Sequence, residues 1–479
     1  MADTSHLASA FPAASAADWR ALVEKTLGDK PFESLFGATV DGVPIAPLYT
    51  ADDAPAPPPM AMRPFDADRP WDLRVAVAHP DPAAANREIL RDLEGGAAST
   101  ILRLDPAAED GVAVGSADDL ARALEGVLLE LAPVGLDAGF LGPRAADWLS
   151  AVAKASPAAR LHFNLDPLSA FAQAGESPGP IESHLVSAAT VAVRMAETYP
   201  QSQLFLASGR VVHEAGGGEV GELAFAAAAA VAYAKALVRA GLPIASALSR
   251  ITLSLAADAD YFVTIAKLRA ARAVWARIAE ACGAPGPARI EARSSRRMLA
   301  GQDVWTNMLR LTSAGFGAAV GGADAIQLGT FTDAIGAPTA FARRQSRNTQ
   351  LVLMEEAHLG RVADPAAGAG YVEALTDGLA RAAWAAFQAI EAKGGLVAAL
   401  TDGAVAADVA RALEARAAAG APKIVGVTAF PPAQEAPVEV ERPARTPVEA
   451  PSPRLPGPDG ACPPLTPIRL SAPFEEAAR

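Results

Sequence analysis

Residues 203–241 read QLFLASGRVVHEAGGGEVGELAFAAAAAVAYAKALVRAG. The first five residues are apolar apart from Gln203, which suits a short buried strand. Residues 219–240 are rich in alanine, a strong helix former, and Gly241 follows as a stop signal. The stretch therefore predicts one strand–helix unit, the building block of a parallel sheet.

The same unit recurs between residues 71 and 425. Strands are expected at 73–78, 100–104, 161–165, 203–207, 251–255, 289–292 and 325–328. Helices are expected at 82–93, 117–129, 183–198, 219–240, 261–282, 304–320 and 338–356. About eight such units favour closure of the sheet into a (β/α)8 barrel.

Composition excludes several classes of protein. The 479 residues are 51 % hydrophobic, which excludes a disordered chain, and the net charge of −13 argues against a nucleic-acid surface. Two cysteines, Cys282 and Cys462, cannot form a disulfide framework. We find no signal-peptide pattern, and the uncharged apolar run 223–234 is shorter than the roughly 20 residues of a membrane span. These features predict a cytoplasmic protein with neither a membrane nor a nucleic acid as partner.

Two flanking segments differ from the middle of the chain. Residues 1–70 contain a helix expected at 16–27 and a proline-rich stretch at 54–64, and predict an arm. Residues 431–479 hold 13 of the 39 prolines, which predicts an extended tail over 426–479. The expected division is thus an arm (1–70), a barrel (71–425) and a tail (426–479).

Few residues stand out as chemically active. His213 opens a His-Glu-Ala-Gly string that partly matches DxHxxG, a cobalt-ligating pattern, but Val211 occupies the Asp position. A hydrogen-bonded loop histidine is the simpler interpretation. Asp105, Asp166 and Asp258 each follow an expected strand, where barrel active sites lie, and could be acid/base groups. For Asp166 and Asp258 we favour helix capping.

Other features are interpreted structurally. Cys282, at the end of an expected helix, is expected to be buried and inert. The glycine runs 216–218 and 321–322 are expected to be turns, since they match no phosphate-binding motif.

Specific strings resemble the methylmalonyl-CoA mutase family. They are FESL (32–35), PLYT (47–50), TIAKLRAAR (264–272), NMLR (307–310), GGAD (321–324), PTAFARR (338–344), RNTQ (347–350), DPAAG (364–368) and IVGV (424–427), in family order. The resemblance implies a (β/α)8 barrel that threads coenzyme A along its axis. Catalytic chains of the family carry adenosylcobalamin on a separate flavodoxin-like domain with DxHxxG. In heterodimeric members, a second, homologous subunit has lost catalysis and supports the first.

Family positions that contact substrate are substituted in this sequence. Asn164 replaces Gln, Gln201 replaces Arg, Arg210 and Val211 replace a Tyr-His pair, and Gln327 lies where the family has Leu-His-Thr-Asn. Residues 58–62, PPMAM, replace a Tyr-containing segment that covers substrate. Loss of the Arg and of the Tyr-His pair removes groups that would stabilise a transition state. We therefore expect no catalytic, cofactor-binding or metal-binding residues in this chain.

The resemblance implies a non-catalytic small subunit of a heterodimeric methylmalonyl-CoA mutase. Residues 473–479 resemble the hinge before the cobalamin domain, so no such domain is expected here. The large subunit would be the partner, would hold adenosylcobalamin, and would be wrapped by the arm and the tail. One alternative is a divergent acyl-CoA mutase barrel that works with a separate cobalamin protein through Asp105, Asn164, Gln201 and Arg210. Another is a scaffold that binds coenzyme A.

Overall fold

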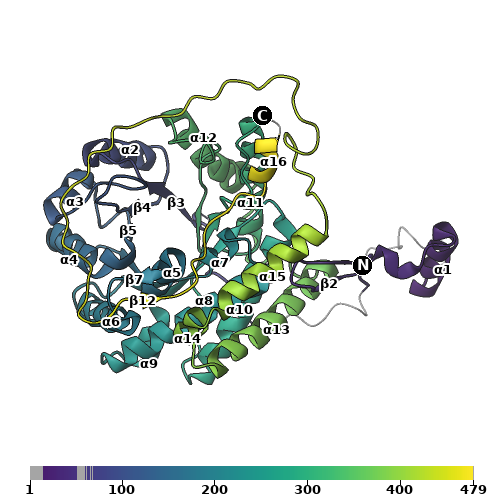
Figure 1. Cartoon of the computed structure of the whole chain (residues 1–479), viewed down its shortest axis with the longest axis horizontal. Helices are drawn as coiled ribbons and strands as arrows, with labels where there is room; N and C mark the ends of the chain where they lie inside the picture. Colours follow the sequence, from purple (N-terminus) through teal and green to yellow (C-terminus); the bar gives the residue numbers. More distant parts are fainter. Residues whose placement is uncertain (1–13, 51–59, 61, 65, 67, 478–479) are drawn as a thin grey trace, which may run out of the picture.

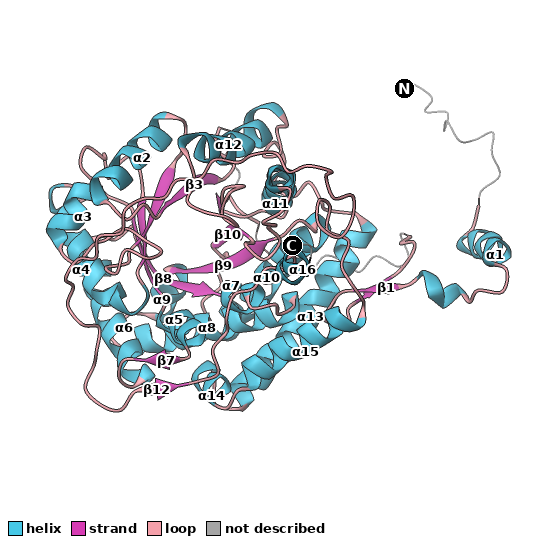
Figure 2. Cartoon of the chain, turned by 45° about the horizontal axis from the view of Figure 1, so that its top comes forward, coloured by secondary structure: helices cyan, strands magenta, loops and turns pink. Residues whose placement is uncertain are grey.

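Eight parallel strands close into a barrel at the centre of the computed structural model, which describes residues 14–50, 60, 62–64, 66 and 68–477. Figure 2 shows the strands as an inner ring surrounded by helices. In spatial order they are β10 (Ile290–Ser294), β11 (Ala325–Gln327), β3 (Asp72–Val77), β4 (Ser99–Arg103), β5 (Val134–Asp137), β6 (Leu161–Leu165), β8 (Gln203–Ser208) and β9 (Ile251–Ala257). The predicted (β/α)8 barrel is confirmed.

The helices on the outside of the barrel follow their strands. They include α2 (Pro82–Glu94), α3 (Ala117–Ala123), α4 (Gly142–Val152), α5 (Pro167–Ala174), α6 (Ile181–Thr198), α7 (Arg210–Glu214), α8 (Glu219–Arg239), α9 (Ile244–Ser249), α10 (Tyr261–Ala281), α11 (Asn307–Val320) and α12 (Ala340–Leu351). Three more, α13 (Gly370–Ala392), α14 (Leu396–Thr401) and α15 (Ala404–Ala418), form an added layer, in which α13 packs on α8 and α10.

Helix α8 belongs to the core. By length and composition it is apolar enough to cross a membrane, but 72 % of its most apolar window is buried inside the protein. Tyr233 stacks on Phe205 of β8, and the alanines on this face let the helix lie close to the barrel. Such burial is what a core helix requires.

Strand β5 (Val134–Asp137) is the barrel strand that was not predicted from the sequence. Strand β5 has only four residues, includes Gly135 and follows Pro133, and both residue types are depleted in strands, so its sequence does not indicate a strand. The glycine is required by packing, because a Cβ at Gly135 would lie 2.2 Å from Cδ1 of Ile101. The helix expected at 117–129 begins where predicted but is shorter, because α3 ends at Ala123. Helix α12 continues to Glu356 as a π-helical turn.

The amino-terminal arm projects from the barrel. Helix α1 (Ala16–Leu27) has a capping box at Ser15 and no buried residue, and it lies apart from the body (Figures 1 and 2). A small hairpin, β1 (Gly37–Ala38) with β2 (Pro44–Ile45), attaches the arm. Val43 is buried beside Gly378 of α13, and Oδ2 of Asp41 accepts a hydrogen bond from the backbone N–H of Val220 at the start of α8.

The attachment of the arm through Asp41 is expected to weaken as pH rises from about 4 to 7. Burial and the nearby Glu219 raise the pKa of Asp41 to about 7, from 3.8. A raised carboxyl pKa favours folding at low pH, and this contribution is lost as pH rises from about 4 through 7. Asp41→Asn keeps the acceptor without the charge. We expect it to exceed the wild type in unfolding free energy by about 1–2 kcal/mol at pH 8 and to match it near pH 4, as measured by urea denaturation. A difference independent of pH would contradict this.

The carboxyl-terminal tail runs along its own barrel. Figure 1 shows it in yellow, circling the helices before it crosses toward α16 (Ala472–Ala477). Backbone N–H groups of the tail donate to carbonyls in connections that follow barrel strands. The pairs are Val448 to Pro106, Leu455 to Pro178, Ile468 to Glu214 and Leu470 to Arg297. A short strand, β12 (Gly460–Ala461), pairs with β7 (Glu176–Ser177). The tail therefore covers its own chain, which differs from the expectation that it wraps the partner.

Leu465 is the apolar anchor of this tail. Its side chain is buried, and its N–H donates to the carbonyl of Ala172 in α5. Leu465→Ala should weaken tail docking by about 2 kcal/mol or more, because core Leu→Ala changes leave a cavity. Limited proteolysis should then cleave the tail at least tenfold faster. Leu131→Ala, at a leucine 73 % exposed, is the matched control and should leave the rate unchanged.

Candidate functional site at the barrel axis and mouth

Charged side chains fill the axis of the barrel. Nη1 of Arg74, on β3, lies 2.6 Å from Oε2 of Glu291, on β10. Arg293, two residues further on β10, pairs with the other oxygen of the same carboxylate. All three side chains are at least 95 % buried. Ser254 donates to Glu291, and Nη1 of Arg293 lies 3.4 Å from Oδ2 of Asp137 across the barrel. One carboxylate thus holds two guanidinium groups at the centre of the fold.

The pKa of Glu291 reflects these contacts. Burial alone would raise it, but the charges of Arg293 and Arg74 and their hydrogen bonds hold it well below its ordinary value. Glu291 is therefore ionised at neutral pH, and an ionic network occupies the axis.

The carboxyl ends of the strands, which we call the mouth, bring together Asn164, Arg210, Val211 and Gln327. Asn164 is the penultimate residue of β6, Gln327 ends β11, and Arg210 and Val211 begin α7 after β8. Val211 is buried and Arg210 is mostly so. Both polar atoms of Asn164, Oε1 of Gln327 and Nε of Arg210 have no hydrogen-bond partner.

Gln201 does not join this group. It lies exposed in the turn before β8, at the amino end of the strand, whereas Arg210 follows the carboxyl end. The positions expected to share one substrate thus lie at opposite ends of the barrel. Residues 58, 59 and 61 of the substituted segment 58–62 lie outside the described residues.

His213 is fully buried in an ionic cluster beside the mouth. Its Nδ1 lies 3.4 Å from Glu222 and its Nε2 lies 3.3 Å from Asp258 and 2.8 Å from Oγ of Ser295. Lys267 pairs with Glu222 at 2.6 Å, and Arg297 pairs with Asp258 at 3.1 Å.

His213 therefore lies in the short helix α7 and not in a loop, and its ring is hydrogen-bonded to Ser295. Burial would raise the pKa of Glu222, but Lys267 and His213 lower it to about 2. Within the described residues, no group of three or more His, Cys, Asp or Glu is arranged to hold a metal ion. This cluster consists of compensated charges that fix α7 against α8 and α10.

Three aspartates that follow strands have structural contacts. Asp105 accepts three backbone N–H groups in a tight turn. Asp166 caps α5 and accepts from the hydroxyl of Tyr233, and burial raises its pKa to about 7. The capping prediction was wrong for Asp258, which pairs with Arg297. Asp260 caps α10 instead.

Other sequence expectations have mixed outcomes. Cys282 was expected to be buried but is exposed at the end of α10. Glycines 216–218 connect α7 to α8, and Gly321 and Gly322 end α11, so both runs are turns as predicted.

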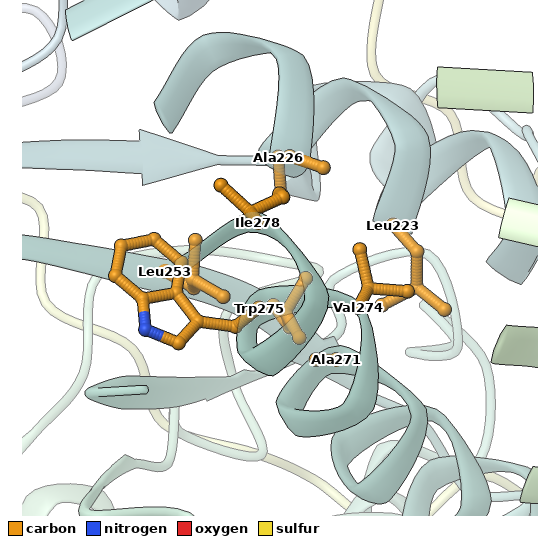
Figure 3. A pocket seen from close by; sticks show the side chains of 9 residues that line it. Leu223, Ala226, Leu253, Ala271, Val274, Trp275 and Ile278 are labelled. Carbon is orange, nitrogen blue, oxygen red and sulfur yellow. The ribbon is translucent and has the colours of Figure 1, made fainter. Parts of the chain in front are cut away.

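A small void lies in the barrel wall, outside the axis. It has a volume of about 10 Å³ and lies among Leu223, Leu253, Val274, Trp275 and Ile278, between α8, α10 and β9 (Figure 3). Its lining is apolar and its volume is about that of one water molecule, so it is a packing defect and not a ligand site.

Sequence reasoning missed the three axial residues. Glu291 and Arg293 alternate along β10, with Arg74 at the matching depth of β3. Charged residues at alternate positions of an expected inner barrel strand are the signal that would have identified them, because such side chains point to the same face.

The structure defines a (β/α)8 barrel whose axis is occupied by a network of ion pairs. The family model for methylmalonyl-CoA mutase matches residues 61–452. The chain belongs to the methylmalonyl-CoA mutase family.

Named relatives specify the type of family member. The chain is 41 % identical over 461 residues to the methylmalonyl-CoA mutase small subunit of Streptomyces virginiae, covering 91 % of this chain and 73 % of that protein. It is 38 % identical over 422 residues to the small subunit of Propionibacterium freudenreichii subsp. shermanii, covering 82 % of this chain and 64 % of that one. A methylmalonyl-CoA mutase of Cereibacter sphaeroides is 30 % identical over 461 residues, covering 88 % of this chain and 65 % of that protein. The sequence is thus of the small-subunit type, although it spans slightly less than two thirds of the last two relatives.

Proposed function

We propose that this chain is a non-catalytic subunit that supports the large, catalytic subunit of a heterodimeric methylmalonyl-CoA mutase. The complex would interconvert methylmalonyl-CoA and succinyl-CoA in the cytoplasm. The large subunit would bind adenosylcobalamin and supply the catalytic groups. The proposal includes the division into arm (1–70), barrel (71–425) and tail (426–479).

The filled barrel axis is the observation that carries this proposal. A mutase barrel that threads coenzyme A needs an open channel, and here Arg74, Glu291 and Arg293 occupy that position. Removing them to admit a ligand would separate buried charges, which is strongly unfavourable. At the mouth, Val211 has no group that could donate to an acyl carbonyl. These features disfavour the divergent-mutase and coenzyme A-binding alternatives.

The arm supplies the surface for a partner. Helix α1 buries nothing in this chain, and Leu22 is 64 % exposed, with Leu35 and Phe36 exposed beyond it. Trp19 and Phe36 both pack edge-on against Phe32 and form an aromatic cluster outside the core. An amphipathic helix held away from its own core is typical of a segment that packs against another protein.

Co-expression with a large subunit of the family tests the proposal. The large subunit should co-purify with this chain and should show higher yield and mutase activity than when expressed alone. Equal yield and activity with and without this chain would contradict the supporting role.

A further inference from the structure

The tail makes a complete circuit of the barrel rim. It contacts the connections that follow β10, β11, β4, β6, β8 and again β10, which is the order of these strands around the closed barrel. The contact pairs, with the tail residue first, are Glu435 with Asp303, Glu441 with Ala337, Val448 with Pro106, Cys462 with Gly175, Ile468 with Glu214 and Leu470 with Arg297. The tail, yellow in Figure 1, therefore returns to the connection at which its circuit begins.

The circuit closes on residues 300–303, which we call the junction. Oε1 of Glu475, near the end of the tail, accepts a hydrogen bond from the backbone N–H of Gly301 at 2.6 Å. The carboxylate of Glu435, at the start of the circuit, accepts from the backbone N–H of Asp303 at 3.0 Å. Two glutamates from opposite ends of the tail thus hold the same short piece of backbone.

The backbones at the junction approach each other closely. A Cβ at Gly301 would lie 2.8 Å from Oε2 of Glu475. A Cβ at Gly426, where φ is +82°, would clash with the carboxylate of Asp303. Asp303 itself has a φ of +45°, in the left-handed region that residues other than glycine rarely adopt. The junction is therefore a fitted contact between the barrel connection and both ends of the tail.

Glu475 is held at the junction as a carboxylate. Burial would raise the pKa of its carboxyl, but hydrogen bonds from Arg469, Ser471 and Gly301 lower it. Nη1 of Arg469 lies 2.7 Å from Oε1, and the Glu475 residue is 8 % exposed. A hydrogen bond from a backbone N–H to an ionised carboxylate is stronger than one to a neutral acceptor. The charge of Glu475 therefore strengthens closure of the circuit.

The two attachments support each other. Both hydrogen bonds require the junction to be ordered, so when one has formed, the other orders fewer backbone torsions and loses less entropy. Binding of Glu435 also tethers Glu475 near its site, which raises the effective concentration of the second attachment. Release of either glutamate should therefore weaken the attachment of the other.

We propose that residues 435–475 form a strap that opens and closes around the barrel mouth as one unit, with the junction as its closing point. In the closed state the strap restrains the connections that follow β10, β11, β4, β6 and β8, which form the rim of the mouth. In the open state these connections can move apart. The strap is a property of the chain by itself and does not depend on the proposed subunit function.

Trypsin cleavage of the full chain after Arg454 measures opening, because Arg454 lies between the two glutamates and Leu455 must first leave the carbonyl of Pro178. The cleavage rate follows the open population when opening and closing are fast. Glu435→Ala and Glu475→Ala should each raise this rate at least fivefold, since each removes a charge-assisted hydrogen bond. Glu439→Ala is the matched control, because Glu439 is exposed on the same tail, and it should leave the rate unchanged.

The double variant distinguishes one unit from two independent attachments. If the strap opens as one unit, the double variant should raise the cleavage rate by less than half the product of the two single effects, because contacts that share a network are not additive. Rate increases that multiply, no increase in either single variant, or an equal increase in Glu439→Ala would each overturn the proposal. Circular dichroism of each variant confirms that the barrel remains folded.

Hydrogen exchange provides a second readout across the junction. Glu435→Ala should raise amide exchange at residues 465–474 at least threefold, and Glu475→Ala should do the same at residues 436–448, because each end depends on the other. Exchange that rises only beside the substituted glutamate would contradict a strap that opens as one unit.

Discussion

Replacing Glu291 with Ala should lower the unfolding free energy by about 3–5 kcal/mol, because it leaves two buried guanidinium groups without their shared carboxylate. Arg74 and Arg293 are both nearly fully buried. Their other partners, Asp72 for Arg74 and Asp137 for Arg293, are 24 % and 45 % exposed and offer weaker compensation. Urea denaturation followed by circular dichroism measures the loss. Glu280→Ala is the matched control, since Glu280 pairs with Arg277 on the surface, and it should change stability by less than about 1 kcal/mol.

A triple variant separates charge from volume. Arg74→Met, Glu291→Leu and Arg293→Met together replace the network with apolar side chains of comparable size. We expect this variant to recover most of the stability that Glu291→Ala loses, because it leaves no fully buried charge unpaired. Asp72 and Asp137, which lose their arginine partners, are 24 % and 45 % exposed and can be hydrated. If Glu291→Ala proves as stable as Glu280→Ala, the axial network does not hold the barrel together.

Deletion of residues 1–36 should abolish co-purification with the large subunit while leaving the barrel folded. Helix α1 buries no residue in its own chain, whereas the hairpin 37–45 that clasps the body is retained. The thermal midpoint of the isolated chain should therefore remain within about 2 °C of wild type, because surface changes cost little.

A single substitution refines the arm experiment. Leu22→Asp places a charge on the exposed apolar face of α1 and should weaken association at least tenfold without affecting the isolated chain. Glu24→Ala, an exposed residue on the opposite side of the same helix, is the matched control and should associate normally. Unchanged association by Leu22→Asp and by the deletion would show that the arm does not form the interface.

The barrel could be predicted from sequence because most of its strand–helix units carry a local signal. Seven of the eight strands have apolar, often β-branched runs followed by alanine-rich helices, as in β8 and α8. Strand β5 has no such signal, since Gly135 is selected by its close approach to Ile101, a contact far away in sequence. The fold class could therefore be predicted although one strand was missed. The position of β5 between β4 and β6, and the residues that it places at the mouth, did not follow from the sequence.

The site was harder to predict than the fold. The substitutions at Arg210 and Val211 can be read directly from the chain, but their effect depends on which residues share the mouth. Only the structure shows that Gln201 lies at the other end, and that Glu291 unites two arginines from strands β3 and β10. Similarly, the prolines of the tail predict an extended segment, whereas its path depends on acceptors such as the carbonyls of Pro106 and Glu214.

Whether this chain contributes catalysis of its own can be measured as mutase turnover by a complex of this chain with a large subunit whose own catalytic residues have been inactivated, supplied with adenosylcobalamin and methylmalonyl-CoA. We expect no succinyl-CoA formation above that of the inactivated large subunit alone, while the complex with an active large subunit turns over normally. Formation of succinyl-CoA that depends on this chain would contradict it.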